Sequence, residues 1–306
     1  MTLINTSTSA FYRRSQSGMQ DLRAQAEALQ ASIGTGLKYT AASDNPVATA
    51  RLRQLGRSDT LSAIDKTNAG RATTDLQLAD TALSNLASAI IRAKELSAQA
   101  ANGTFTPAQR RSIGAEISSI RTSVIRLANT NDANGHALFG GQSAGAAYTT
   151  DTSGNAVYAG TASAGTLSLG DGQVVNRGVT GPEFLNFTHN GVPTDLLATL
   201  KTLADALQNA DPAAQSIANA SLDTLNSGLD AVTTAQSLVG SRLASIDLAN
   251  DRRTAMEELR AGEEADTGGT DLAAAVTKLQ ETMTVLQASQ ASFAKLARLS
   301  LFDVLN

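Results

Sequence analysis

Apolar residues recur in steps of three and four along both ends of this 306-residue chain, and this spacing constrains the fold more than any other feature. It places the apolar side chains on one face of a helix, so that each helix needs a partner along a narrow seam. The clearest runs are Leu76, Ala79, Leu83, Leu86, Ile90 and Ala93; Ile113, Ile117, Ile120, Val124 and Leu127; Leu225, Leu229, Val232, Val239, Leu243 and Ile246; and Leu272, Val276, Leu279, Met283, Leu286 and Phe293. The sequence therefore predicts long helices packed as coiled coils.

The composition suits narrow helix seams and excludes several chemistries. Only 4% of the residues are aromatic and Trp is absent, which favours seams of Ala and Leu over a thick globular core. The absence of Cys excludes a disulfide scaffold, thiol catalysis and a Cys-based zinc site. With 24 basic and 28 acidic residues the net charge is −4, so we expect no nucleic-acid partner.

Proline and its neighbours mark where helices begin. In the helix-start motif Asp44, Asn45 and Pro46, the asparagine suits the N-cap position and the proline suits the first helical position. Thr106–Pro107 and Asp211–Pro212 show the same pattern of a capping residue followed by proline. We therefore expect a long helix to begin at each of these three places.

The middle of the chain has a different composition. Residues 135–191 contain 12 of the 24 glycines, and short alternating runs flank turn signals there. One pair of runs surrounds Ser153–Gly154, and another surrounds Asp171–Gly172, a dipeptide typical of two-residue hairpin turns. We therefore expect two β-hairpins in this region and a turn around His189.

These patterns predict a mainly α fold: an elongated antiparallel helical bundle and coiled coil, built from paired N- and C-terminal arms, with a small β-rich insert at its far end. The expected parts are terminal coiled-coil helices (1–45 with 270–306), a helical bundle domain (46–138 with 196–269) and the insert domain (139–195). Because the composition changes abruptly at both borders of the insert, we expect the insert to be dispensable for assembly.

One catalytic pattern occurs in the insert. Gly141–Gly145 fits the Gly-x-Ser-x-Gly nucleophile elbow with Ser143 as the nucleophile, but the elbow needs a strand before it and a helix after it. The sequence predicts loops on both sides. The two histidines, His136 and His189, lack the spacing of a metal-ligand pair. A serine hydrolase is therefore a remote alternative, and we expect no enzyme, no cofactor and no metal.

The chain shows neither a secretory signal nor a membrane span. Its first residues lack a basic stretch followed by an apolar one, and no run approaches 18 uninterrupted apolar residues. These features alone would predict a cytoplasmic protein without membrane insertion.

Several stretches, in order along both arms, resemble the flagellin superfamily. They are SIGTGLK (32–38), SDNPVA (43–48), RAKELSAQAANG (92–103), ANTNDANG (128–135), LFGG (138–141), QASQASF (287–293) and LSLF (299–302). Filament subunits carry Ser-Ser-Gly and Asp-Asp-Ala where this chain has Gly34–Gly36 and Asp44–Pro46, and they end near Leu-Leu-Arg or Leu-Leu-Gly. The chain therefore resembles the hook–filament junction branch of the superfamily, and a short flagellin is the alternative.

The resemblance implies a structural function, in which a ring of subunits adapts the hook to the flagellin filament and is needed for filament assembly and motility. The implied partners are further copies of the chain, hook-associated protein 1, flagellin and an export chaperone. It also implies type III export without a cleaved signal and an extracellular location on the flagellum, which replaces the cytoplasmic prediction.

The two ends of the chain carry apolar positions that lack a full set of partners. The final run ARLSLFDVLN is apolar to its last residues, whereas chain ends are ordinarily polar. A polar stretch, residues 263–269, is expected to separate this last helix from the one before it. Because the N-terminal seam from Phe11 to Leu29 is weak, we expect both ends to be disordered in the free monomer and to fold against neighbouring subunits. The predicted assembly interface comprises Ile4, Phe11, Leu22, Leu29, Ile33, Leu279, Met283, Leu286, Phe293, Leu296, Leu299, Leu301, Phe302 and Leu305.

Overall fold

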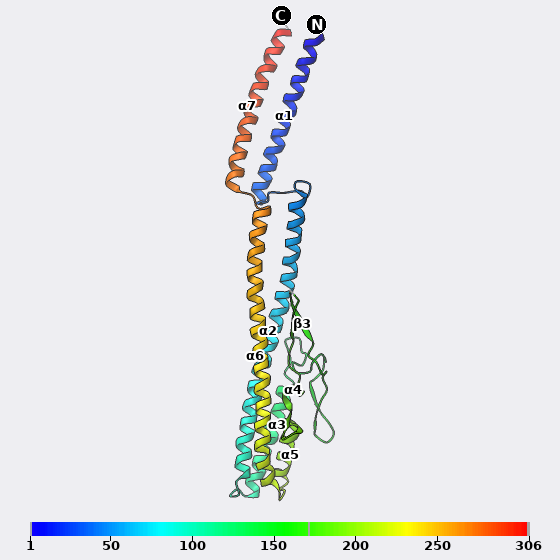
Figure 1. Ribbon diagram of the computed structural model, residues 1–306, viewed down its shortest axis with the longest axis vertical. Helices are drawn as coiled ribbons and strands as arrows, with labels where there is room; N and C mark the ends of the chain where they lie inside the picture. The colour runs from blue at the N-terminus through cyan, green and yellow to red at the C-terminus, as the bar shows by residue number, and fades with distance from the viewer. Residues whose placement is uncertain (1, 171, 305–306) are drawn as a thin grey trace. The chain divides into compact units, whose positions relative to one another are not determined.

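The computed structural model describes residues 2–170 and 172–304, and the side chains of residues 10–170 and 172–295. Its first elements are α1 (Thr2–Thr35), α2 (Pro46–Ala101) and α3 (Pro107–Ala128). The middle contains β1 (Tyr148–Thr150), β2 (Ala156–Tyr158), β3 (Thr166–Gly170), β4 (Gln173–Asn176), α4 (Pro182–Leu185), β5 (Asn186–His189) and β6 (Val192–Asp195). The last elements are α5 (Leu196–Gln208), α6 (Ala214–Gly268) and α7 (Leu272–Val304) (Figure 1).

The chain divides into two compact units. One unit combines residues 1–60 with 255–306, and the other comprises residues 61–254. Both borders fall inside α2 and α6, so each unit takes one stretch from each of these long helices. The three-part division suggested by composition stays a prediction.

A mainly α fold with a small β-rich insert is confirmed. The strands form three separate two-stranded antiparallel sheets, β1–β2, β3–β4 and β5–β6. The first pairs Tyr148 with Tyr158, and the second pairs Thr166 with Asn176. These two sheets are the hairpins that the turn signals predict.

The third hairpin was missed by the sequence analysis. β5 and β6 are joined by Asn190 and Gly191, whose φ angles of 50° and 80° are those of a two-residue hairpin turn. His189 is therefore the last residue of β5, not part of the turn. The Asn-Gly signal was present, but the strands beside it are only four residues long and carry a proline, Pro193.

The predicted helix seams form the core of the unit that comprises residues 61–254. Leu76, Leu83, Leu86 and Ile90 of α2 are fully buried, as are Leu225, Val232, Val239 and Ile246 of α6. Ser97 joins the two helices: its buried hydroxyl donates to the carbonyl oxygen of Ala218 at 2.8 Å and so has a hydrogen-bond partner.

The helices α3 and α5 pack closely because Gly114 has no side chain. A Cβ at Gly114 would lie 2.8 Å from the Cβ of Leu207 and 3.0 Å from the carbonyl oxygen of Ala204. At this close contact, the side-chain nitrogen of Gln208 also donates a hydrogen bond to the Gly114 carbonyl oxygen, at 3.0 Å. The contact therefore depends on glycine at this position.

We expect Gly114→Ala to lower the free energy of unfolding by about 1–3 kcal/mol, because the added methyl group overpacks the contact between α3 and α5. The matched control is Gly70→Ala, on an exposed face of α2 with no atom near the added Cβ. That substitution should stabilise the helix slightly, by up to about 1 kcal/mol. Urea unfolding of both variants measures the difference, and equal stabilities would contradict the packing.

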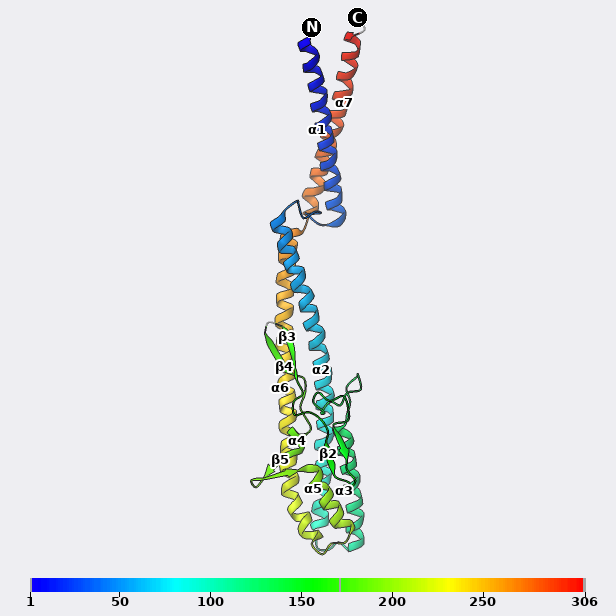
Figure 2. The same ribbon diagram turned by 90° about the vertical axis from the view of Figure 1, so that its right-hand side faces the viewer.

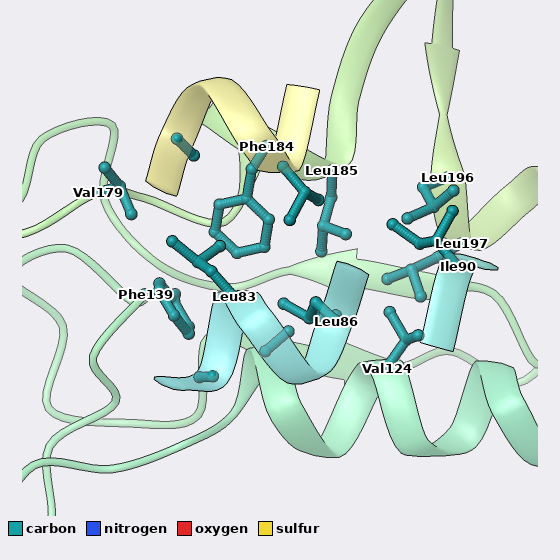
Figure 3. Close-up of a cluster of buried hydrophobic side chains, with 14 of the residues drawn as sticks. Leu83, Leu86, Ile90, Val124, Phe139, Val179, Phe184, Leu185, Leu196 and Leu197 are labelled. Atoms are coloured by element: carbon teal, nitrogen blue, oxygen red, sulfur yellow. The ribbon is translucent and has the colours of Figure 1, made fainter. Parts of the chain in front are cut away.

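The insert does not stand apart at the far end of the bundle, contrary to the expectation from its composition. Figure 3 shows Phe139, Phe184 and Leu185 against Leu83 and Leu86 of α2, in one continuous cluster of buried side chains. The rings of Phe139 and Phe184 meet edge to face, with their centroids 4.9 Å apart. The insert therefore shares the core of the helices.

Arginines of the helices also hold the backbone of the insert. Arg121 of α3 donates to the Gly154 carbonyl oxygen at 2.6 Å, and Arg253 of α6 donates to the Leu169 carbonyl oxygen at 2.6 Å. Such charge-assisted hydrogen bonds are stronger than neutral ones. The insert is therefore attached to the helices by hydrogen bonds as well as by its shared core, and its dispensability for assembly stays a prediction.

Because Phe184 is fully buried where the insert meets α2, we expect Phe184→Ala to destabilise the protein by about 3–5 kcal/mol. The matched control is Val174→Ala on β4, whose side chain is exposed in the same insert. It should change the stability by less than about 0.5 kcal/mol. Two equally small effects in urea unfolding would restore the picture of an independent insert.

The sequence misplaced two boundaries of α6. The polar stretch 263–269 does not end the helix early, because α6 continues through most of it to Gly268. Glu263 is helical there and pairs with Arg51 of α2. At the other end, Asp211 and Pro212 form a turn, and the helix begins two residues later at Ala214. Thr106–Pro107 behaves as predicted, because Thr106 and Gln109 form a capping box at the start of α3.

Candidate assembly interface

The terminal helices α1 and α7 lie side by side, and both views of the ribbon show the pair (Figures 1 and 2). The Tyr12 ring of α1 meets the Phe293 ring of α7 edge-on, with the centroids 5.4 Å apart. Among the described side chains of this pair, the buried ones are Ala26 on α1 and Ala275, Thr282 and Leu286 on α7. The N- and C-terminal arms are therefore paired as predicted, through a seam of few and mostly small side chains.

The predicted interface residues lie at three levels of burial. Leu286 is buried, whereas Phe11 is 49% exposed and Met283 is 37% exposed. The half-buried ones are Leu22, Leu29, Ile33, Leu279 and Phe293. Ile4, Leu296, Leu299, Leu301 and Phe302 belong to the helical backbone, but their side chains lie outside the described ones, and Leu305 lies outside the described residues.

The helix α7 carries more apolar surface than α1 covers. Leu272, Val276, Met283 and Val285 remain exposed although α1 lies alongside. Val285 was missed by the sequence analysis because it is one position off the seam that passes through Leu286. A helix that is apolar on more than one face is typical of burial among several neighbours.

A cavity of about 310 Å³ interrupts the seam between the terminal helices. Ser15 and Gly18 of α1 and Ser289 and Ser292 of α7 are too small to fill it, and Phe11, Met19, Leu22 and Phe293 complete its lining. The cavity is large enough for an apolar side chain from outside the pair. The sequence signal for it was the weakness of the N-terminal seam.

The helix-start motif builds the beginning of α2. Pro46 is its first residue, and the Asn45 side-chain oxygen accepts a hydrogen bond from the Ala48 amide at 3.1 Å, as an N-cap does. The Asp44 carboxylate accepts from the amides of Ala41 at 2.8 Å and Thr40 at 3.0 Å. The hydrogen bond from Ala41 is the main cause that lowers the pKa of Asp44, so this carboxylate keeps the loop before α2 closed at neutral pH.

We expect the double change Asn45→Ala and Pro46→Ala to lower stability by about 1–2 kcal/mol, mostly through loss of the cap. Val47→Ala is the matched control, because Val47 is the next residue and its side chain is exposed. Thermal unfolding followed by circular dichroism gives the comparison. Melting temperatures that agree for both variants and the parent would show that the motif is an ordinary loop.

The structure places Ser143 in a loop with no strand before it and no helix after it. Ser143 shares the lining of a cavity of about 180 Å³ with Asp132 and His136. Within the described part of the chain, no hydrogen bond joins Ser143 to a histidine: its hydroxyl accepts from the Gly145 amide, and the His189 ring bonds Ser227. The nucleophile elbow is therefore not formed.

The described residues contain neither a membrane-spanning helix nor a cluster of metal ligands. None of their helices combines the length and the apolarity that crossing a membrane requires. Nor do three of their His, Cys, Asp or Glu side chains gather as ligands for a metal ion.

Comparison with known proteins relates both arms to flagellar proteins. Residues 4–144 match the bacterial flagellin N-terminal helical region. The chain is 26% identical to flagellar hook-associated protein 3 of Salmonella typhimurium, over 97% of this chain and 98% of that protein. It is 27% identical to flagellar hook-associated protein 3 of Escherichia coli with the same coverage.

Solved structures share the fold. A putative flagellar hook-associated protein from Vibrio parahaemolyticus matches with a TM-score of 0.67 at 24% identity, covering 74% of this chain and 100% of that one. FlgL from Xanthomonas campestris matches with a TM-score of 0.61 at 17% identity, covering 69% of this chain and 99% of that one. The resemblance to the flagellin superfamily is thus confirmed: residues 4–144 match its N-terminal helical region, and the chain as a whole is similar to flagellar hook-associated protein 3.

Proposed function

We propose that this chain is a structural subunit of the bacterial flagellum, located at the hook–filament junction, where it adapts the hook to the flagellin filament. The observation that carries this proposal is the similarity to flagellar hook-associated protein 3 over nearly the whole of both chains. The subunit is needed for filament assembly and motility, and its role is mechanical and not catalytic.

The surface of the terminal helices supports an assembly role. Leu272, Val276, Met283 and Val285 leave apolar side chains of α7 open to solvent on more than one face, and the seam with α1 contains an unfilled cavity. Burying such side chains contributes about 1.5–3 kcal/mol each, which favours association with neighbouring subunits. The proteins that bury these apolar side chains are further copies of the chain, hook-associated protein 1 on the hook side and flagellin on the filament side.

The proposal includes the route to this location. The chain leaves the cell through the flagellar type III exporter without a cleaved signal, held by an export chaperone, and assembles outside. An unfolded passage suits a chain without Cys, because no disulfide needs to form or rearrange. The weak seam between α1 and α7 suits terminal helices that fold fully only against their neighbours.

Motility rescue tests the location. The gene is expressed in one strain that lacks its junction protein and in another that lacks flagellin, and swimming is scored on soft agar. Rescue of the first strain alone is the expected result. Rescue of the second strain alone would make the chain a short flagellin, and rescue of neither, with the chain found in the medium, would exclude both roles.

Replacing Val276, Met283 and Val285 together with Ser should abolish stable junction assembly while the melting temperature of the monomer changes little, because these side chains are exposed in the free chain. The matched control replaces Val157, Val174 and Val192, which are exposed on the insert hairpins, with Ser. Secretion into the medium is measured for both variants, so that a failure of export is separated from a failure of assembly. An exported triple variant that still builds motile filaments would contradict an assembly role for α7.

A further inference from the structure

The linkers beside the terminal helices are joined to each other. We define the linker ribbon as residues 36–38, which follow α1, and residues 268–270, which precede α7. The Lys38 amide donates to the Gly268 carbonyl oxygen at 2.8 Å, and the Thr270 amide donates to the Gly36 carbonyl oxygen at 2.9 Å. Leu37 and Gly269 thus face each other as an antiparallel pair.

Glycines make this ribbon possible. Gly36 has a φ of 70°, which lets the chain leave α1 while its amide still donates to the Ser32 carbonyl oxygen at 2.9 Å. At the end of α6, the Gly269 amide likewise donates to the Ala265 carbonyl oxygen at 2.9 Å. A Cβ on Gly269 would overlap that oxygen, so no other residue fits without a shift of the backbone.

The ribbon is anchored on the α2 and α6 side. Arg51 of α2 forms a two-point ion pair with Glu263 of α6, with 2.8 Å between Nη2 and Oε2. Arg260 pairs with Asp59 at 2.6 Å, and Gly268 packs against Leu52 so closely that a Cβ there would lie 2.8 Å from Leu52 Cδ1. These contacts hold the start of α2 and the end of α6 together beside the ribbon.

The seam between α1 and α7 specifies its own register poorly. The residues that face each other at its cavity include Ser15, Gly18, Ser289 and Ser292, and small side chains like these tolerate a slip of the helices. In sequence, the C-terminal end of α1 lies more than 200 residues from the N-terminal start of α7. Closing so long a loop costs more chain entropy than closing a short one.

We propose that the linker ribbon is a register clamp, which holds the end of α1 and the start of α7 at a fixed offset so that the two helices pair in one alignment. Gly36 follows α1 directly, and Asp271, next to Thr270, caps α7 by accepting from the Ala274 amide at 3.0 Å. Pairing then extends from the clamp along the two helices, with the last turn of α1 and the first turn of α7 already in place. This device goes beyond the proposed function, because it is a property of the single chain wherever the chain is located.

Amide hydrogen exchange on the full chain tests whether the clamp forms. We expect the Lys38 and Thr270 amides to be protected, and Gly269→Ala to speed their exchange about fivefold or more through loss of these hydrogen bonds. Gly262→Ala, in the helix α6 that ends just before Gly269 and with no atom near the added Cβ, is the control and should leave both amides unchanged. Unprotected Lys38 and Thr270 amides in the parent chain would overturn the proposal.

Crosslinking tests whether the clamp sets the register. Because the chain lacks Cys, a short bis-maleimide reports one introduced pair at a time. The in-register pair Tyr12→Cys with Phe293→Cys should react at least about tenfold faster than the slipped pair Tyr12→Cys with Leu286→Cys, and Gly269→Ala should reduce this preference severalfold. Thr270→Pro, which removes the second donor directly, should do the same while the core amides of α2 keep their protection. An undiminished preference in both variants, or no preference in the parent chain, would overturn the clamp.

Discussion

The narrow seam between α2 and α6 is the contact on which the other packing of the 61–254 unit depends. Its buried residues are mostly Leu, Ile, Val and Ala, and Ser97 bridges the two helices by donating to the Ala218 carbonyl oxygen. The same cluster continues from Leu83 and Leu86 into Phe139 and Phe184 of the insert. Without the seam, neither α3 and α5 nor the three hairpins would have a surface on which to pack.

The terminal helices α1 and α7 are less well packed against each other. Their seam buries few side chains, leaves a cavity beside Phe11 and Phe293, and exposes Val276 and Val285 on α7. A pair with so little buried area gains little stability by itself, so its remaining apolar surface is available to neighbours. The ion pair of Arg51 with Glu263 and the ribbon beside it join this weakly paired part to the stable helices. The well-packed core thus lies in residues 61–254, and the surface that we propose for assembly lies on the terminal helices.

Much of the fold follows from the sequence, because periodicity and capping are local. The seam from Leu76 to Ala93, the start of α2 at Pro46 and the hairpin around Asp171–Gly172 all rest on patterns a few residues long. The contact of Phe184 with α2 could not be predicted, because it joins residues about a hundred positions apart through shape alone. The end of α6 was misplaced because charged residues such as Glu263 suit a helix surface as well as a loop. For the proposed interface, heptad spacing identified Leu286 but not Val285. Which side chains of α7 stay exposed depends on how α1 packs against it, and the spacing within one helix does not show this.

Thiol labelling most directly tests the claim that α7 is an assembly surface. A single Cys in place of Val285, which is 51% exposed in the free chain, is compared with one in place of Val174, which is 65% exposed on the insert. Both should react with a maleimide reagent in the purified monomer. In isolated flagella, the Cys at position 285 should become unreactive while the Cys at position 174 serves as the reference. Equal labelling of position 285 in monomer and flagella would contradict burial of α7 by neighbouring subunits.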